Sequence, residues 1–377
     1  MHKETQCVHS GTYHDKSTGG IGTPIFTSSS FEYMDRDENL YPRYFNTPNQ
    51  SAVVRKLCDL ESAEDGVLFS SGMAAISTTL LAFAGAGDHV VMLDALYGGT
   101  HAFATETFDR VGMQYTFTAT DAEAVSQAAT PATRVIVIES PTNPLLEVID
   151  IRKVTAFAKA RGIVTVMDNT FASPINQTPL DLGIDVVVHS GTKYLGGHSD
   201  LCCGVALTSR ENANRIRSLA HHLGGSLNAI TCHLLERSLK TLALRVERQT
   251  ENAARLAAYL DGHAAVRRVN YPGLRHFSGH EIAASQMTGF GGMLSFELDT
   301  ERVQPAAFLN RLKLIRPAVS LGGVETIICA PTETSHAKMS AEERARIGVT
   351  HALLRLSSGI EHPEDLLEDL ANALGGD

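Results

Sequence analysis

Short β-rich runs alternate with helical patterns along most of the chain from Asn49 onward. Runs of strand length occur at His89 to Asp94, Arg134 to Glu139, Gly162 to Asp168 and Asp185 to His189. Strands that alternate with helices form βαβ units, so we expect an α/β fold built around a mainly parallel sheet.

One connecting helix can be predicted in detail. Asp150 is placed to cap a helix over Ile151 to Arg161, and Gly162 is placed to end it. Val154 and Phe157 contribute to an apolar stripe at helical spacing. We therefore expect this helix to pack on the sheet.

The second half of the chain predicts a longer helix and a smaller domain. Apolar residues recur at helical spacing from Asn228 to Asp261, which predicts one long helix that links two domains. Beyond it, Gly292 to Asp299 and Ala352 to Ser357 have strand patterns, and Pro363 to Leu374 predicts an amphipathic helix with Pro in its first turn. Residues 1–45 lack sustained periodicity and predict an extended arm.

Charge and composition exclude several classes of protein. The chain has 377 residues, 43% of them hydrophobic, which is enough for a packed core. A formal net charge of -10, with no basic cluster, argues against nucleic acid as a partner. No stretch approaches the length of a membrane span and the first residues have no apolar leader, so we expect a cytoplasmic protein without a membrane partner.

The cysteines and histidines do not predict a metal site. The six cysteines match neither a zinc ligand set nor a disulfide scaffold, and we expect buried free thiols. The sixteen histidines include no H-E-x-x-H or comparable helical pairing, so we predict that no metal is bound.

The most informative segment runs from Asp185 to His198. A buried strand ends there at two hydroxyl residues, Ser190 and Thr192, just before Lys193. A lysine at the carboxyl end of a sheet strand can be desolvated, which lowers its pKa and makes the amine nucleophilic toward an aldehyde. The hydroxyl groups could bind a phosphate, whereas the plain alternative is a surface lysine in a loop.

Two other strand ends carry residues with matching chemistry. Asp168 ends an apolar strand and could keep a pyridine nitrogen protonated, although an N-cap or turn aspartate is the plain alternative. Gly72 and Met73 precede a helical run from Ala74 to Phe83, so their backbone N–H groups could bind an anion. Taken alone, Ser-Gly before a helix is usually only a cap.

With these motifs in this order, the chain resembles the Cys/Met-metabolism enzymes that depend on pyridoxal 5'-phosphate (PLP), the transsulfuration group of cystathionine γ-synthase, cystathionine γ-lyase and methionine γ-lyase. The resemblance covers nearly the whole chain and is most specific around Lys193. It implies the type I PLP-dependent, aspartate aminotransferase-like fold, with an arm at 1–45, a PLP-binding domain at 46–242 and a C-terminal domain at 243–377. It also implies a homotetramer built as a dimer of dimers.

The resemblance implies a role for each matching residue. Lys193 would bind PLP as a Schiff base, Asp168 would face the pyridine nitrogen, and Tyr97 would stack on the ring and move protons. The remaining implied contacts are to the phosphate (Gly72, Met73, Ser190 and Thr192), to a neighbouring subunit's phosphate (Tyr41 and Arg43), to the cofactor's phenolic oxygen (Asn143) and to the substrate (Arg355, Ser320, Val319 and Asn143).

Plain alternatives remain for these residues as well. Tyr97 could be an ordinary core aromatic, Asn143 a turn residue before proline, Arg355 half of a structural salt bridge, and Ser320 a turn serine.

Three positions depart from the family pattern. Asn46-Thr47-Pro48 stands where Asn-Pro-Thr is usual, which leaves the local path of the arm open. Gly99 stands where methionine γ-lyases carry a cysteine. Val319 stands where members that act on cystathionine usually have an acid, so it favours a substrate with an uncharged distal end, such as methionine, homocysteine or an acylhomoserine.

We therefore expect an enzyme that binds a small amino acid and eliminates its Cγ substituent, giving 2-oxobutanoate, ammonia and a thiol. Gamma-replacement by a cystathionine γ-synthase or an O-acylhomoserine sulfhydrylase is the alternative, because both reactions share an intermediate. A PLP-binding regulator would not need both Tyr97 and Arg355, and a nicotinamide dehydrogenase would need a G-x-G-x-x-G motif that is absent after the first strand.

Overall fold

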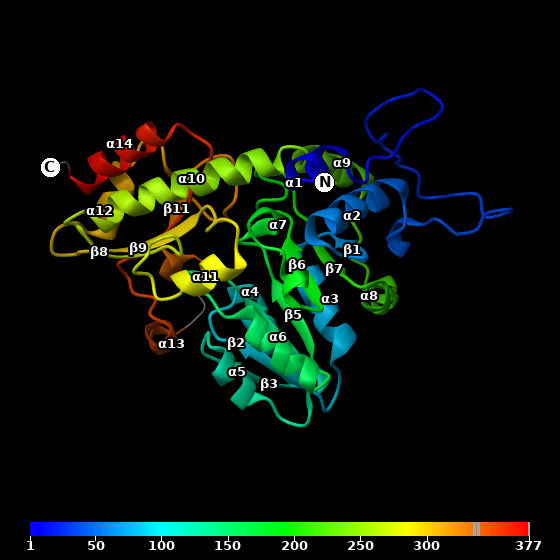
Figure 1. Ribbon diagram of the computed structural model, residues 1–377, viewed down its shortest axis with the longest axis horizontal. Helices are drawn as coiled ribbons and strands as arrows, with labels where there is room; N and C mark the ends of the chain where they lie inside the picture. The colour runs from blue at the N-terminus through cyan, green and yellow to red at the C-terminus, as the bar shows by residue number, and fades with distance from the viewer. Residues whose placement is uncertain (335–336, 338–339, 376–377) are drawn as a thin grey trace.

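Two sheets lie at the two ends of the molecule, and a long helix runs between them (Figure 1). The structure is a computed structural model that describes residues 1–334, 337 and 340–375. The larger sheet has the strand order β1-β7-β6-β5-β4-β2-β3. Its strands are β1 (Asp65–Phe69), β2 (His89–Leu93), β3 (Gln114–Thr118), β4 (Thr133–Glu139), β5 (Val164–Asp168), β6 (Val186–Ser190) and β7 (Gly204–Thr208).

Neighbouring strands of this sheet run parallel except where β7 is involved. Strand β7 is antiparallel to both β1 and β6, whereas β2, β3, β4, β5 and β6 pair in parallel. The prediction of an α/β fold with a mainly parallel sheet is confirmed. The carboxyl ends of β4, β5 and β6 therefore meet at one edge of the sheet, where ligands of α/β proteins usually bind.

The smaller sheet has the order β10-β11-β12-β9-β8. Its neighbours are antiparallel, except that β10 and β11 are parallel. Its strands are β8 (Val266–Asn270), β9 (Met293–Leu298), β10 (Arg316–Pro317), β11 (Ile327–Cys329) and β12 (Leu353–Ser357).

Helices cover the sheets. The α-helices are α1 (Lys3–His9), α2 (Pro48–Glu61), α3 (Gly72–Phe83), α4 (Gly98–Thr107), α5 (Ala122–Ala128), α6 (Ile151–Ala160), α7 (Ser173–Asn176), α8 (Arg210–Leu223), α9 (Ala229–Leu239), α10 (Leu242–Asp261), α11 (His280–Gln286), α12 (Pro305–Arg311), α13 (Ala341–Arg346) and α14 (Pro363–Leu374). The 3-10 turns are η1 (Pro42–Tyr44), η2 (Phe108–Val111), η3 (Pro179–Leu182) and η4 (Pro331–Glu333).

Successive residues of β1 serve two different cores. Val67 and Phe69 belong to the cluster that includes residues of α3 and α8, whereas Leu68 belongs to the cluster that includes residues of α2 and α9. Successive side chains of a strand point to opposite faces, so a continuous apolar run can fill both. This is why β2, β4 and β5 are mostly buried and apolar, whereas the edge strand β3 alternates polar and apolar residues.

The predicted helix after Asp150 is confirmed, and it forms α6. The Asp150 carboxylate accepts a hydrogen bond from the Lys153 backbone N–H at 3.1 Å, which is the predicted N-cap. Val154 is buried in the core beneath the sheet. The helix at the C-terminus is also confirmed as α14, with Pro363 in its first turn.

The single helix predicted from Asn228 to Asp261 is wrong, because the structure divides it into α9 and α10. The break falls at Lys240 and Thr241, and Thr241 leaves helical geometry with φ -112° and ψ 11°. The Arg245 guanidinium donates to the Ser238 carbonyl at 3.0 Å, which satisfies an acceptor that the break exposes. Apolar spacing continues across the break, which is why the pattern did not reveal it.

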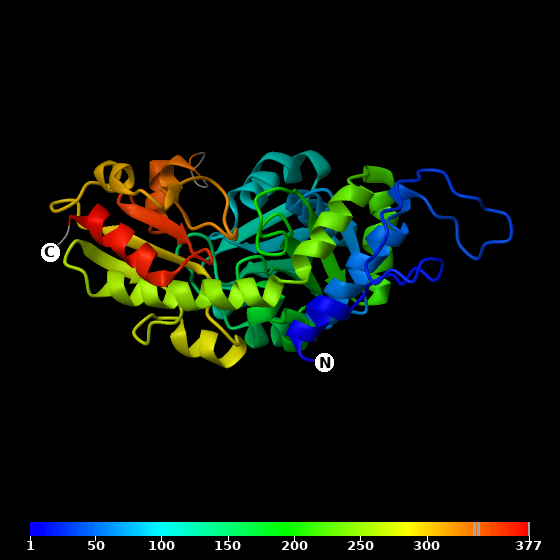
Figure 2. The same ribbon diagram turned by 90° about the horizontal axis from the view of Figure 1, so that it is seen from above.

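The N-terminal arm is only partly extended, because it begins with α1. The Lys56 side chain is fully buried in α2 and donates to the Cys7 carbonyl at 3.0 Å. A buried ammonium needs such acceptors, and the carbonyls at the end of a helix supply them. The rest of the arm projects from the body as irregular loops (Figures 1 and 2), with Ile21 and Tyr33 exposed.

Candidate active site

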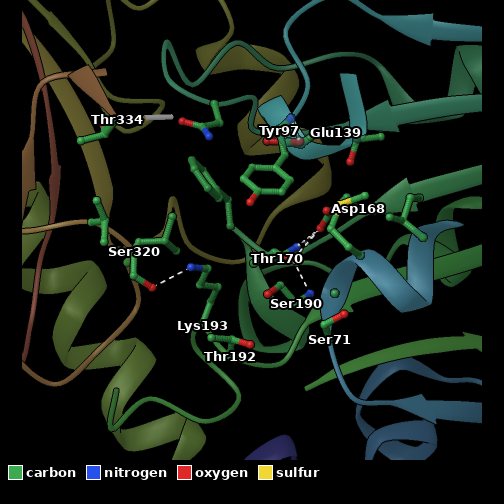
Figure 3. Close-up of a pocket in the computed structure, with 18 of the residues that line it drawn as sticks. Ser71, Tyr97, Glu139, Asp168, Thr170, Ser190, Thr192, Lys193, Ser320 and Thr334 are labelled. Carbon is green, nitrogen blue, oxygen red and sulfur yellow. Dashed lines mark hydrogen bonds between the residues drawn. The ribbon is translucent and has the colours of Figure 1, made fainter. Parts of the chain in front are cut away.

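A cavity of about 620 Å³ opens where the carboxyl ends of the large sheet face the smaller sheet, and it gathers most of the predicted site residues. Those that line it are Gly72, Met73, Tyr97, Asn143, Asp168, Ser190, Thr192, Lys193, Val319, Ser320 and Arg355. They come from segments as far apart in sequence as α3 and β12, and Figure 3 shows several of them facing a common space.

Lys193 stands three residues after the end of β6 and its amine points into the cavity (Figure 3). The turn is closed by the Lys193 backbone N–H, which donates to the Ser190 carbonyl at 3.1 Å. The Lys193 Nζ donates to the Ser320 hydroxyl at 2.6 Å. Burial, and then the nearby Arg355 charge, lower the pKa of Lys193. A larger share of the amine is therefore unprotonated and nucleophilic.

Asp168 is the last residue of β5 and lies beside β6 in the parallel ladder. Its Oδ1 accepts hydrogen bonds from the Thr170 hydroxyl at 2.5 Å and from the Thr170 backbone N–H at 3.0 Å. The same hydroxyl accepts from the Ser190 backbone N–H at 2.9 Å, so it joins the ends of β5 and β6. Burial raises the pKa of Asp168, and the hydrogen bonds from Thr170 oppose that shift. A cation bound against this carboxylate would favour its ionised form.

The start of α3 offers backbone donors beside the Ser190 turn. Ser71 caps the helix by accepting from the Ala74 backbone N–H at 3.0 Å, which leaves the N–H groups of Gly72 and Met73 at a helix N-terminus. Close packing also requires a glycine at position 72, because a Cβ there would lie 2.8 Å from the Cβ of Ser190. The helix start can therefore approach the Ser190 turn closely enough for both to face one anion.

The Thr192 hydroxyl is partly engaged elsewhere. It accepts from the Cys203 backbone N–H at 3.1 Å and donates to the Cys203 carbonyl at 3.3 Å, although the residue lines the cavity. Thr192 therefore holds the lysine turn against β7.

Tyr97 stands at the N-cap of α4 and extends its ring into the cavity, with 45% of the residue exposed (Figure 3). Its backbone N–H donates to Glu139 Oε2 at 2.9 Å. Glu139 also accepts from the backbone N–H of Asn143, and it is buried at the end of β4. Burial and the neighbouring Asp168 raise the pKa of Glu139 well above its usual value.

Arg355 reaches the cavity from β12 and is held by groups on two other segments. Its Nη1 donates to Asn143 Oδ1 at 2.9 Å and its Nη2 donates to the Ser320 carbonyl at 3.1 Å. Ser320 adopts a left-handed backbone with φ +81°, which is strained for a residue other than glycine. This conformation presents its hydroxyl to Lys193 and its carbonyl to Arg355 together. Arg355 forms no ion pair with the described residues, so the salt-bridge alternative gains no support.

Tyr41 and Arg43 do not line this cavity. The Arg43 Nη1 donates to the His221 carbonyl at 2.6 Å, and the guanidinium lies over the rings of Tyr41 and Tyr44. Both residues belong to the end of the arm. Their predicted contact with a neighbouring subunit stays a prediction, because the structure contains one chain.

Sequence reasoning missed several polar residues of the cavity. They are Ser71, Glu139, Thr170, Cys202, Glu333 and Thr334. Glu139 and Thr170 could have been found, because each stands at or just after the end of a central parallel strand. Glu333 could not, because it belongs to a 3-10 turn near the small sheet with no motif around it.

The cysteines differ from expectation at one position. All are free, and five are buried as predicted, but Cys202 is exposed at the cavity. Within the described ranges, no group of three or more His, Cys, Asp or Glu side chains is placed to hold a metal ion. No helix of the described chain is both long enough and apolar enough to cross a membrane.

Comparison with known proteins gives one consistent result. The family model described as "Cys/Met metabolism PLP-dependent enzyme" matches residues 4–375. The chain is 42% identical to the cystathionine gamma-lyase of Bacillus subtilis (strain 168), over 99% of each chain. It is 41% identical to the cystathionine beta-lyase of Lactococcus lactis subsp. cremoris (strain MG1363), over 98% of each.

A solved structure is similarly close. Cystathionine gamma synthase from Xanthomonas oryzae pv. oryzae, in complex with cystathionine, superposes with a TM-score of 0.96 at 38% identity, over 99% of this chain and 98% of that one.

Proposed function

The chain belongs to the Cys/Met-metabolism family of PLP-dependent enzymes, and from this membership we propose that it is a carbon–sulfur lyase of sulfur amino-acid metabolism. It eliminates the Cγ substituent of a methionine-, homocysteine- or cystathionine-type substrate and gives 2-oxobutanoate, ammonia and a thiol. The family, the type I PLP-dependent fold, the PLP cofactor and the enzymatic nature predicted from the sequence are confirmed.

The residues of the cavity fit the cofactor. The helix start at Gly72 and Met73, with Ser190 close beside it, suits a phosphate. The partly buried Asp168 carboxylate suits a protonated pyridine nitrogen, and the Lys193 amine with its lowered pKa suits an aldehyde. When bound there, PLP supplies an electron-withdrawing ring that stabilises negative charge on the substrate's α-carbon.

One observation carries the proposal: the Lys193 amine, the Asp168 carboxylate and the Arg355 guanidinium face a single cavity from three different elements. Arg355 offers a planar fork to the α-carboxylate of an amino acid, and Asn143 fixes that fork by accepting from it. With PLP bound, the Lys193 amine, whose pKa is lowered by burial, would be placed to act as the base for the α-proton. Tyr97 has a phenol within the same space and is assigned the transfer of protons near the Cγ substituent.

Gamma-replacement is the second candidate function. The structural similarity to the synthase from Xanthomonas oryzae favours it. A non-catalytic PLP-binding regulator is disfavoured, because Tyr97 and Arg355 both reach the cavity. Elimination and replacement share the loss of the Cγ substituent. They differ in whether the unsaturated product is then hydrolysed or takes up a thiol. We favour elimination because the γ-lyase and β-lyase relatives match the chain at 41 to 42% identity.

The assembly and location are part of the same proposal. A homotetramer built from two dimers would bring Tyr41 and Arg43 of one subunit to the phosphate of a neighbour. The exposed arm, with the Arg43 guanidinium over the rings of Tyr41 and Tyr44, supports that arrangement. We place the enzyme in the cytoplasm.

Product analysis of the purified holoenzyme tests the proposal. Methionine, cystathionine, homocysteine, cysteine and an O-acylhomoserine are each supplied with and without sulfide. We expect 2-oxobutanoate from at least one Cγ-substituted substrate without any thiol acceptor. Turnover of the acylhomoserine only when a thiol is present would establish replacement instead, and pyruvate in place of 2-oxobutanoate would establish β-elimination.

A further inference from the structure

One acidic residue of the cavity has no part in the roles assigned so far. Glu333 ends the η4 turn, is exposed, and lines the same cavity as Arg355. The other two lining carboxylates are engaged within the site, since Glu139 accepts from backbone N–H groups and Asp168 accepts from Thr170. Glu333 is therefore the carboxylate of the described lining that faces solvent and incoming molecules.

The topology of the small sheet brings Glu333 to the same end of the sheet as Val319. Strands β10 and β11 are parallel, and the Ala318 backbone N–H continues their pairing by donating to the Ile328 carbonyl at 2.9 Å. The segments that follow β10 and β11 therefore leave the sheet at the same end. Glu333 is held near that end because its backbone N–H donates to the Ala330 carbonyl at 3.0 Å.

This end of the sheet also carries Arg355, the residue assigned to the substrate's α-carboxylate. Arg355 on β12 lies opposite Cys329 at the end of β11, four residues before Glu333. Figure 3 shows Thr334, the next residue, on the same side of the cavity as Ser320 and across from Asp168. Glu333 therefore belongs to the side of the cavity formed by the small sheet, away from the floor assigned to the cofactor.

We propose that Glu333 is a specificity residue that binds a positively charged group at the distal end of the substrate. This inference rests on the proposed function and narrows it to amino acids whose sulfur-linked substituent carries a second ammonium group, as in cystathionine. Val319 is apolar and 70% exposed, so it offers a cation no partner at the cavity mouth. The Glu333 carboxylate in η4 supplies that partner, because an ammonium group that loses bound water on entering the cavity needs an opposite charge nearby.

The test compares kcat/KM for cystathionine and for methionine in the wild-type holoenzyme and in Glu333→Gln. Glutamine keeps the size of the side chain and removes its charge. We expect kcat/KM for cystathionine to fall by about three- to fivefold, mainly through KM, and that for methionine to stay within about 1.5-fold. The ratio of the two constants removes any general loss of active protein.

Two further variants sharpen the comparison. Glu342→Gln removes the same charge from an exposed position of α13 that does not line the cavity, and it should leave the ratio unchanged. Glu333→Gln combined with Val319→Glu returns a carboxylate to the same end of the sheet, and it should recover at least part of the preference for cystathionine.

A binding measurement gives a readout apart from turnover. Borohydride-reduced holoenzyme binds substrate without reacting, so calorimetric titration with cystathionine reports affinity alone. We expect the affinity of Glu333→Gln for cystathionine to fall about fivefold at low salt, with a smaller difference at high salt because exposed charges are screened.

The outcomes separate this inference from the proposed function. An unchanged cystathionine-to-methionine ratio in Glu333→Gln, with unchanged binding, would overturn the role of Glu333 while leaving the lyase in place. A wild-type protein that holds PLP but releases no 2-oxobutanoate from either substrate would instead overturn the proposed function.

Discussion

Lys193 has unusual chemistry because of the side chains around it rather than because of its own residue type. Its amine is half-buried, lies near the Arg355 charge and donates to the hydroxyl of a strained serine. Burial and a neighbouring positive charge both favour the neutral amine. The same surroundings explain why Lys193→Arg would not conserve function, since a guanidinium stays protonated.

The Lys193→Ala variant should bind no cofactor covalently. We expect the purified variant to lose the visible absorbance of the holoenzyme and to yield no borohydride-fixed peptide, which mass spectrometry of a digest would detect. Lys159→Ala, which changes an exposed lysine of α6, serves as the matched control and should keep the adduct. An adduct retained in Lys193→Ala would show that another amine holds the cofactor.

Glu139 predicts a pH dependence of stability in the cofactor-free protein. Its pKa is raised in the folded state, so the folded protein binds this proton more tightly than the unfolded chain does. Its stabilising contribution is complete below the ordinary pKa of about 4.5 and is lost as the pH rises toward the folded value. Glutamine cannot titrate and does not lose that contribution.

We therefore expect Glu139→Gln to become more stable relative to wild type as the pH rises, so that the difference in free energy of unfolding increases. The limiting slope is about 1.4 kcal/mol per pH unit. Urea unfolding of both proteins at intervals between about pH 5 and pH 8, above the ordinary pKa of a glutamate, measures how this difference in free energy changes with pH. A difference that stays constant with pH would mean that Glu139 titrates normally.

At the scale of elements, the break between α9 and α10 is joined to the lysine turn through Arg245. Its Nη1 donates to the Tyr194 carbonyl at 2.8 Å, and its Nη2 donates to the Ser238 carbonyl at 3.0 Å. Gly197 has to be glycine here, because its φ is +67° and a Cβ would lie 1.9 Å from Arg245 Nη1. The helix break and the turn after Lys193 therefore form one packed unit.

Arg245→Met should destabilise the protein by about 3 kcal/mol, because the Tyr194 carbonyl loses its donor and the Ser238 carbonyl loses one of several. Burial lowers the pKa of Arg245 to about 10, so the side chain remains charged at neutral pH. Urea unfolding of the holoenzyme measures the loss. Arg248→Met, at an exposed position of the same helix, is the control and should stay within about 0.5 kcal/mol of wild type. Equal effects of the two substitutions would contradict this account.

At the scale of the whole molecule, α10 ties two cores together. Its first residues, including Leu242 and Val246, pack in the core that contains residues of α2 and α9, whereas Leu256 and Leu260 pack in the core of the small sheet. The helix therefore fixes the small sheet relative to the large one (Figure 1). That fixed relation brings Arg355 and Glu333 to the cavity that contains Lys193. The domain limits at 45 and 242 stay a prediction, although α10 begins at Leu242.

Subunit complementation tests the predicted sharing of sites between chains. Arg43→Ala keeps Lys193 but lacks the arm's guanidinium, whereas Lys193→Ala keeps Arg43. If Arg43 serves the neighbouring subunit, mixed dimers contain one complete site, and unfolding and refolding the two variants together should recover about a quarter of wild-type activity. Activity that never exceeds that of the separate variants, although mixed oligomers form, would show that Arg43 has no part in a neighbour's site.

Local patterns along the chain were enough to predict the larger features of the fold and the chemistry of the cofactor side. Strand and helix periods, Asp150 as a cap, and motifs that end strands at Asp168 and just before Lys193 all depend on local order, so they are legible in one dimension. Carboxyl ends of neighbouring parallel strands must share an edge, which is why those two residues could be placed together.

Tertiary structure decided the rest, because it depends on which distant groups satisfy one another. The helix break at Thr241 follows apolar spacing without interruption and is stabilised by an arginine that also holds the Tyr194 carbonyl. The resemblance implied that Ser320 belongs to the site but not its left-handed backbone, and the exposed Glu333 belongs to no recognised motif. They reach the cavity only because α10 packs in two cores and sets the small sheet against the large one.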